Sequence, residues 1–358
     1  MCLGLLSALV GGCASAGFYL QAVAGQLEIW RREVPTERLL ADPALDADTR
    51  AKLELVATAL AYARTELALP AGGSYRSYAD LGRDYVVWNV FAAPELALRP
   101  HQSCFLIAGC LDYRGYFRRE HAERYAARLR TRGFDVFVGG VAAYSTLGWF
   151  EDPILNTFLA WPEADLIEIL FHEIAHQRIY VPDDTTFNES YATAVAEAGL
   201  ERWYRDRYGS AAAIRARHQR KREVLALIDH TRSALDALYA GDLPDAHKRE
   251  AKKTLFAELT TRYARLRAAT HETASSDHTM AAEWNNARIS AFATYHDFVP
   301  PFRALLEACG GDFAAFHRAA SAIAALDTGA RHSRLRGFEI EGQAITCNAA
   351  ADGATVTH

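Results

Sequence analysis

FHEIAHQRIY, at residues 171–180, decides the predicted fold, because it places two histidines and a glutamate within one helical segment. His172 and His176 are four residues apart and project from adjacent turns of a helix, so both imidazoles can bind one metal ion. Glu173 lies about 100° further round the helix. From there its carboxylate borders the metal without ligating it, and it can take a proton from an attacking water. This spacing is the H-E-x-x-H pattern of zinc-dependent peptidases.

The surrounding sequence supports a buried helix. Residues 162–181 read PEADLIEILFHEIAHQRIYV, in which apolar residues fill most positions. Pro162 suits the first turn, and Pro182 marks the end of the segment. Two histidines and a glutamate are costly to bury without partners in so apolar a helix. A metal ion is one such partner; the alternative is a pair of hydrogen-bonded core histidines.

A zinc site needs a third protein ligand, and Glu189 is the leading choice. It follows His176 by thirteen residues, in the run FNESYATAVAEAGLERWY. Asn188 is a good N-cap, so we expect Glu189 to open a second helix. The small residues Ala192 and Ala196 would let this helix pack closely on the first and bring the carboxylate to the metal. Glu189 could instead be a first-turn residue that interacts only with the helix dipole.

Three other carboxylates compete with Glu189 for this role. Asp183 and Asp184 lie in the connecting loop, and Glu197 lies two turns beyond Glu189. The side chain of Glu197 is rotated well away from that of Glu189. A metzincin would have a histidine at position 182, which is Pro182 here, so that class does not fit.

The two segments FHEIAHQ and FNESYAT together resemble a bacterial family of predicted zinc aminopeptidases, a group of envelope lipoproteins. Other segments that resemble this family are DYVVWNVFAAPEL, GCLDYRGYF, GFDVFVGGVAAYSTLGWFEDPILNTFL, NNARISAFATYHDFVPPF and GGDFAAF. The resemblance covers nearly the whole chain. The site is also similar to that of gluzincins with a short spacing to the third glutamate. The G-x-M-E-N amine-recognition motif of the large aminopeptidase family is absent, so aminopeptidase activity is implied only by the resemblance.

The N-terminus predicts a lipid anchor. Residues 1–17 read MCLGLLSALVGGCASAG, and LVGGC resembles a bacterial lipobox whose cysteine, Cys13, carries the lipid. Residues 1–12 would then be a signal segment, although no Lys or Arg precedes the apolar run. The run is too short to span a membrane, which needs about 20 apolar residues. With the resemblance, this predicts a protein anchored in the bacterial cell envelope and facing the periplasm.

Without the signal segment 1–12, four cysteines remain beside Cys13, and they are consistent with an oxidising compartment. The four allow three pairings. Cys104 and Cys110 flank FLIAG and could close a small loop, while Cys309 and Cys347 could tie the C-terminal segment to the body. Four unpaired buried thiols are the alternative.

The pattern along the chain predicts a mainly α fold with a small β-sheet, an α+β class with zincin-like architecture. Residues 13–347 form one elaborated domain, with a disordered tail at 348–358. We expect two helices in residues 14–69, broken near Pro35 and Pro43. We expect strands at YVVWNVFA, SCFLIAG and FDVFVGGV, a helix at 118–132, a helical arm at about 210–270 broken at GDLPD, and a further helix over EWNNARISAFATYHDFVP. The arm either packs on the body or binds a partner.

Residues near the predicted cleft complete the site. Tyr144 and Ser145 precede the metal-binding helix, where many zincins place the strand that pairs with substrate; a structural strand end is the alternative. Tyr295 or His296 could hydrogen-bond the oxyanion of a transition state, or could simply pack in the core.

These observations predict a peptidase that uses one Zn²⁺ ion, with Glu173 as the general base. The alternative is a non-catalytic envelope lipoprotein with a structural zinc site, which would have no need for a base beside the metal. Peptide and membrane are the expected partners. The net charge of −5 gives no electrostatic reason to expect nucleic-acid binding.

Overall fold

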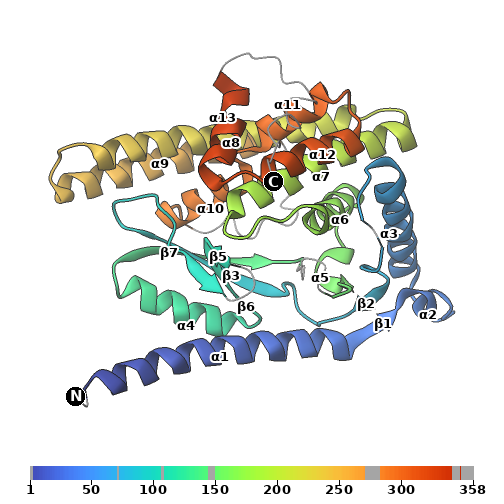
Figure 1. Ribbon diagram of the computed structural model, residues 1–358, viewed down its shortest axis with the longest axis horizontal. Helices are drawn as coiled ribbons and strands as arrows, with labels where there is room; N and C mark the ends of the chain where they lie inside the picture. Colours follow the sequence, from blue (N-terminus) through green and yellow to red (C-terminus); the bar gives the residue numbers. More distant parts are fainter. Residues whose placement is uncertain are drawn as a thin grey trace, which may run out of the picture.

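The computed structural model describes residues 3–70, 72–105, 109–143, 150–270, 283–340 and 347. The described chain is mainly helical with small β-sheets, which confirms the predicted α+β class. Figure 1 shows its layers: α1 and α4 lie on one side of a central sheet, and α10 and the long helices α8 and α9 lie on the other.

The helices are α1 (Leu3–Arg32), α2 (Thr36–Leu40), α3 (Ala47–Glu66), α4 (Arg119–Arg130), α5 (Asn156–Leu159), α6 (Glu163–Arg178), α7 (Thr185–Tyr208), α8 (Ala212–Ala240), α9 (Asp245–Thr270), α10 (Asn286–His296), α11 (Val299–Ala308), α12 (Phe313–Ala324) and α13 (Thr328–Ile340). The strands are β1 (Glu33–Pro35), β2 (Ser77–Ala79), β3 (Val87–Pro94), β4 (Ser103–Phe105), β5 (Gly109–Leu111), β6 (Tyr113–Tyr116), β7 (Phe134–Val141) and β8 (Ile154–Leu155).

The central sheet has the order β6-β3-β7, and all its neighbours are antiparallel. Strand β3 is buried on both faces, which explains its nearly continuous apolar sequence. Val90 and Ala92 contribute to the apolar cluster that contains buried residues of α4. Phe91 and Ala93 pack on the opposite face, in the cluster that contains buried residues of α10. The strand therefore joins two layers of the core.

A second sheet has the order β1-β2-β8, in which β2 is antiparallel to β1 and parallel to β8. Tyr78 of β2 is opposite Val34 of β1 and opposite Ile154 of β8. This sheet connects the end of α1 to the segment that leads through α5 into α6. It therefore places the chain before β2 beside the chain before β8.

The metal-motif helix α6 packs directly on α7. The small residues Ala192 and Ala196 of α7 are both buried. Gly199 of α7 leaves little room for a side chain. A Cβ atom there would lie 2.7 Å from a methyl carbon of Leu67 and 3.0 Å from the ring of Phe171. A larger side chain at this position would have to displace the Leu67 or Phe171 side chain.

Some predicted elements are divided differently in the structure. The predicted pair of helices in residues 14–69 is α1, the short α2 and α3, with strand β1 between the first two. Asp46 accepts a hydrogen bond from Thr49 N at 2.9 Å and caps α3. The helix α1 continues from Leu3 past position 13 without a break. The predicted helix from Glu283 to Pro300 is two helices, α10 and α11, separated at residues 297–298.

The predicted strand SCFLIAG is instead a hairpin of two short strands, β4 and β5. Cys104 and Cys110 are cross-strand partners in it and form a disulfide. The chain must reverse between these two residues, so a single strand through the segment was a wrong prediction. The segment Phe134–Val141 forms β7, and α4 covers most of the predicted helix at 118–132, as expected.

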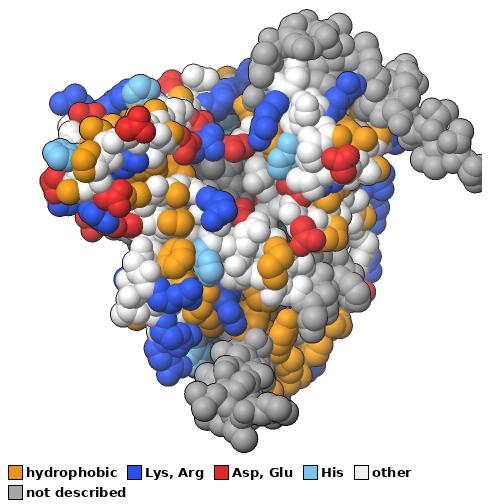
Figure 2. All heavy atoms as spheres, turned by 60° about the vertical axis from the view of Figure 1, so that its left-hand side comes forward, with side chains coloured by type: hydrophobic (Ala, Val, Ile, Leu, Met, Phe, Trp, Pro, Cys, Tyr) orange, Lys and Arg blue, Asp and Glu red, His pale blue; other side chains and the backbone are white. Residues whose placement is uncertain are grey.

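The predicted arm is the antiparallel pair α8 and α9, which turns at residues 241–244. It packs on the body: Leu227, Leu235 and Leu259 share an apolar cluster with Trp284 and Ile289. In the face shown in Figure 2, acidic, basic and apolar side chains are interspersed. Within the described ranges, no helix has both the length and the apolar character that a membrane crossing requires.

Candidate metal centre

The H-E-x-x-H residues all lie on α6, and the helix itself sets their directions. α6 begins after Pro162 and has Glu163 and Asp165 in its first turn, where carboxylates favour the helix dipole. It ends at Arg178, four residues before Pro182. The motif therefore lies in the last two turns of the helix, close to the loop that leads into α7.

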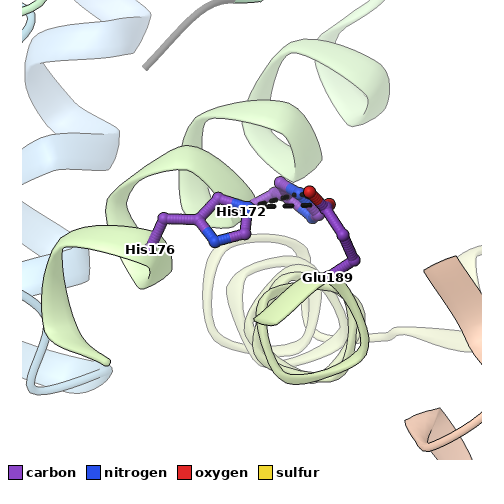
Figure 3. Close-up of side chains that lie close together, drawn as sticks. All are labelled: His172, His176 and Glu189. Carbon is purple, nitrogen blue, oxygen red and sulfur yellow. Dashed lines mark hydrogen bonds and ion pairs between the residues drawn. The ribbon is translucent and has the colours of Figure 1, made fainter. Parts of the chain in front are cut away.

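The side chains of His172, His176 and Glu189 converge between α6 and α7 (Figure 3). His172 Nε2 lies 3.2 Å from Glu189 Oε2 and 3.1 Å from His176 Nε2. His176 Nε2 lies 3.6 Å from the same Glu189 oxygen. Tetrahedral zinc, with bonds of about 2.0–2.2 Å, keeps its ligand atoms about 3.3–3.6 Å apart. The three atoms are thus spaced as ligands of one small cation would be.

The hydrogen-bonding capacity of the three groups also fits a cation. A proton on His172 Nε2 can be donated to Glu189, but that nitrogen then has no lone pair for His176. A proton on His176 Nε2 can be donated to His172, but His172 then presents a lone pair to the Glu189 carboxylate. Protons alone cannot satisfy all three contacts at once. A metal ion accepts a lone pair from each, so the donor set fits Zn²⁺.

The charges around the site favour ionised Glu189. Burial alone raises the pKa of its carboxyl, but the His176 and His172 imidazoles outweigh burial and lower this pKa to about 2. Glu173 differs, because burial is the largest influence and raises its pKa, reinforced by Glu189 and Asp152 against the two histidines. The two glutamates therefore have different environments: the pKa of Glu189 is lowered, and the pKa of Glu173 is raised.

The loop between α6 and α7 determines which carboxylate faces the histidines. Asp184, rather than Asn188, caps α7, because its side chain accepts a hydrogen bond from Phe187 N at 3.1 Å. The predicted Asn188 cap is therefore wrong. Asn188 lies in the first turn of α7 and binds the backbone of Val181 twice, at 2.8 and 2.7 Å. These contacts fix the start of α7, so that Glu189 points toward α6.

Both loop aspartates have other partners. Asp184 is buried and accepts a hydrogen bond from Arg331 Nε at 2.8 Å, and its carboxylate lies 2.9 Å from His332 Nε2. Asp183 accepts a hydrogen bond from the backbone nitrogen of Cys110 at 2.5 Å. The structure therefore brings neither of them to the histidines. It connects them to α13 and to the β4–β5 hairpin instead.

Glu197 was the remaining alternative to Glu189 as the third ligand. It belongs instead to a second, separate group of titratable side chains. It could form a metal site with Glu168 and His218 by geometry alone. However, Lys221 Nζ lies 3.1 Å from Glu197 and 3.8 Å from Glu168, so an ammonium already provides the positive charge there. This group connects α6, α7 and α8 and supports the helices that carry the candidate ligands.

Three tyrosines near the site were not identified from the sequence as site residues. Burial and then the Glu189 charge raise the pKa of Tyr113, on β6, and the pKa of Tyr180, which follows α6. Burial and then the Glu173 charge raise the pKa of Tyr75. Tyr113 lies in GCLDYRGYF, one of the family-like segments, and Tyr180 ends the stretch FHEIAHQRIY that contains the H-E-x-x-H pattern. No signal in the sequence marked Tyr75.

Other predicted residues lie outside the described part. Tyr144 and Ser145 are not among the described residues, and the side chains of Tyr295 and Cys13 are not described, although their backbones lie in α10 and α1. His296 is described. Its ring Nδ1 lies 3.1 Å from the Phe292 carbonyl, and burial lowers its pKa to about 4, which favours the neutral form.

The structure pairs the four cysteines as two disulfides, Cys104–Cys110 and Cys309–Cys347. The second bond connects the end of α11 to a residue beyond α13. The first closes the hairpin whose Cys110 nitrogen binds Asp183 in the loop between α6 and α7. A disulfide thus closes a hairpin that contacts the loop between α6 and α7.

Comparison with known proteins identifies one family. The model of the family described as "Putative aminopeptidase" matches residues 17–335, which is most of the 358-residue chain and includes α6 and α7. No curated protein and no solved structure matches.

Proposed function

Since this chain belongs to the putative aminopeptidase family, we propose that it is a zinc-dependent peptidase whose metal is held by His172, His176 and Glu189. The family itself indicates a peptidase. The metal dependence and the roles of the residues are our proposal. The observation that carries it is the convergence of two imidazole nitrogens and one carboxylate oxygen within 3.6 Å of one another.

Zinc at this position would supply Lewis acidity for activating water and the scissile carbonyl. The chain provides the rest. Glu173 lies on α6 beside His172 and His176, and it would take a proton from the attacking water. Its raised pKa lets it hold this proton and pass it to the leaving amine. The Asn188–Val181 contacts and the Asp184 cap keep the third ligand in place while this happens.

We also propose that Cys13 carries a lipid and holds the protein in the bacterial cell envelope, facing the periplasm. The lipobox-like LVGGC sequence supports this. Two disulfides support an oxidising compartment, because such bonds persist where thiols are not kept reduced. Metabolic labelling with a fatty acid should mark the wild-type chain and not Cys13→Ala. Equal labelling of both would contradict the lipid anchor.

The zinc proposal is tested by comparing metal content with turnover. Wild-type protein should contain one zinc ion per chain and hydrolyse a peptide library. His176→Ala should lose zinc, because two ligands bind it much more weakly than three. Glu173→Gln should keep the zinc and lose at least about 100-fold in kcat, because it lacks a general base.

Glu120→Gln, which changes an exposed glutamate of α4, is the control and should affect neither quantity. Wild-type protein without zinc would contradict the metal assignment. A zinc-loaded wild-type protein that hydrolyses no peptide would favour the non-catalytic, structural zinc site.

A further inference from the structure

The segment just before β2 lies against the face of α6 that carries Glu173. Gln177 Nε2 donates a hydrogen bond to Ser74 Oγ at 3.1 Å. Gln177 follows Glu173 by four residues, so the two side chains occupy the same helix face on adjacent turns. Ser74 is thereby fixed one turn from Glu173, and the next residue is Tyr75.

The same segment is also fixed to the chain before β8. Tyr75 N donates to the Asp152 carbonyl at 2.6 Å, and Asp152 N donates to Ser74 Oγ at 3.2 Å. Tyr75 and Asp152 are both buried. The charges that raise the pKa of Tyr75, after burial itself, are those of Glu173 and then Asp152. The phenol therefore lies beside these two carboxylates.

The hydroxyl of Tyr75 is an unpaired polar group. Tyr75 is only 4% exposed, yet its Oη atom has no hydrogen-bond partner within the described structure. A buried hydroxyl without a partner costs about 1–3 kcal/mol. The backbone of Tyr75 is also strained, because its φ is 65°, a value that residues other than glycine seldom adopt. Such costs are typical of positions that serve binding or catalysis.

The surroundings of this hydroxyl are negative. Glu33 accepts a hydrogen bond from Ser77 Oγ at 3.2 Å, and burial followed by the nearby Asp152 and Glu151 raises its pKa. Among the described residues, neither Glu33, Glu151 nor Glu173 forms an ion pair with Lys or Arg. Carboxylates thus extend from the exposed Glu151 inward to Glu173. This set of hydrogen-bond acceptors fits a ligand that carries a cationic group.

We propose that Tyr75 and Asp152 bind the free α-ammonium group of the peptide substrate, next to Glu173 of the candidate metal centre. An ammonium has three donors, which the Tyr75 Oη lone pair and the carboxylate oxygens of Asp152 can accept. A substrate fixed by its first amine presents its first peptide bond to Glu173. Such an amine site would make the protein an aminopeptidase that lacks the G-x-M-E-N motif. The amine-site proposal rests on the peptidase function proposed above.

Binding of an amine that cannot be hydrolysed tests this directly. Isothermal titration calorimetry of the zinc-loaded full chain compares leucinol, an amino alcohol with a free amine, with N-acetylleucinol. Wild-type protein should bind leucinol at least about 10-fold more tightly, because a hydrogen bond to a charged group contributes about 1.5–3 kcal/mol. Tyr75→Phe and Asp152→Asn should each remove most of this preference.

Matched controls separate the site from its surroundings. Tyr78→Phe and Asp80→Asn change a nearby tyrosine and aspartate. The charges that act on Tyr78 are those of Asp80 and Asp46, and Asp80 Oδ1 accepts a hydrogen bond from Gly82 N, so both variants should keep the preference. Tyr75→Phe removes a hydroxyl that has no partner, so it should unfold at the same or a higher urea concentration than wild type. A loss of the preference in this variant would then be a loss of recognition and not of folding.

Hydrolysis of free and N-acetylated peptides by wild type separates the two proposals. Equal binding of both alcohols, or an unchanged preference in Tyr75→Phe, overturns the amine site even if peptides are hydrolysed. Selective binding of leucinol that depends on Tyr75, with no hydrolysis of any peptide, supports the amine site and overturns the peptidase function.

Discussion

The buried histidine of α12 should make this protein markedly less stable in mild acid. His317 is fully buried, with Nε2 2.9 Å from the Leu67 carbonyl and Nδ1 2.8 Å from Tyr191 Oη. A carbonyl only accepts, so Nε2 carries the proton and donates it to Leu67. Nδ1 therefore accepts a hydrogen bond from Tyr191. Tyr191 lies two residues after Glu189 on α7, so His317 also supports the turn that carries the third candidate ligand.

Protonation of Nδ1 would bury a positive charge and remove the acceptor that Tyr191 needs. Burial, opposed by the Leu67 contact, accordingly lowers the pKa of His317 from 6.5 to about 4. Between these values the unfolded chain binds more protons than the folded one, so stability falls as pH falls through this range. A difference of about 2.5 pKa units corresponds to about 3 kcal/mol, fully present above pH 6.5 and lost by about pH 4.

Urea denaturation at a series of pH values between 7.5 and 4 measures this loss. His317→Gln retains an amide that can donate to Leu67 and accept from Tyr191, but it does not titrate. The wild-type free energy of unfolding should therefore fall by about 3 kcal/mol more than that of His317→Gln over this range. His247→Gln, at an exposed position of α9, is the control and should follow wild type. Parallel pH profiles for wild type and His317→Gln would refute the reasoning.

Two further predictions concern the start of α7. Asn188→Ala should lower the free energy of unfolding by about 1–3 kcal/mol, since it removes both side-chain hydrogen bonds to the Val181 backbone, and should weaken zinc binding measured by competition with a chelator. An unchanged zinc affinity would show that the loop does not position Glu189. Arg331→Met should destabilise by about 3 kcal/mol, because it leaves the Asp184 carboxylate buried with only its other contacts. Urea denaturation of the double variant with Asp184→Asn should recover part of this loss, and full additivity would contradict the coupling.

The sequence alone was sufficient to predict the features that depend on the helical repeat. His172, Glu173 and His176 lie within five residues, so the 3.6-residue period places both imidazoles on one face whatever the rest of the chain does. The long apolar pattern around them predicted a buried helix, and α6 is that helix. The same local logic predicted β7, most of α4 and the α8–α9 pair, because periodicity and turn residues act over short distances.

Only the tertiary structure decided which carboxylate faces the two histidines. Asp183, Asp184, Glu189 and Glu197 were all open choices, since their distance from α6 depends on how α7 packs. The Asp184 cap and the contacts of Asn188 with Val181 turn Glu189 inward, whereas the sequence predicts Asn188 as the cap. A cap is a competition between nearby side chains, and long-range contacts such as that of Asp184 with α13 determine the winner.

The surroundings of Tyr75 could not be predicted from the sequence. Its strained backbone and unpaired hydroxyl arise because β2 pairs with β8, more than 70 residues later in the chain, and because Ser74 binds Gln177 on α6. No local pattern in the sequence around Tyr75 indicates this. Contacts between distant segments exist only after the chain has packed, so helix positions could be predicted from the sequence while the surroundings of Glu173 could not.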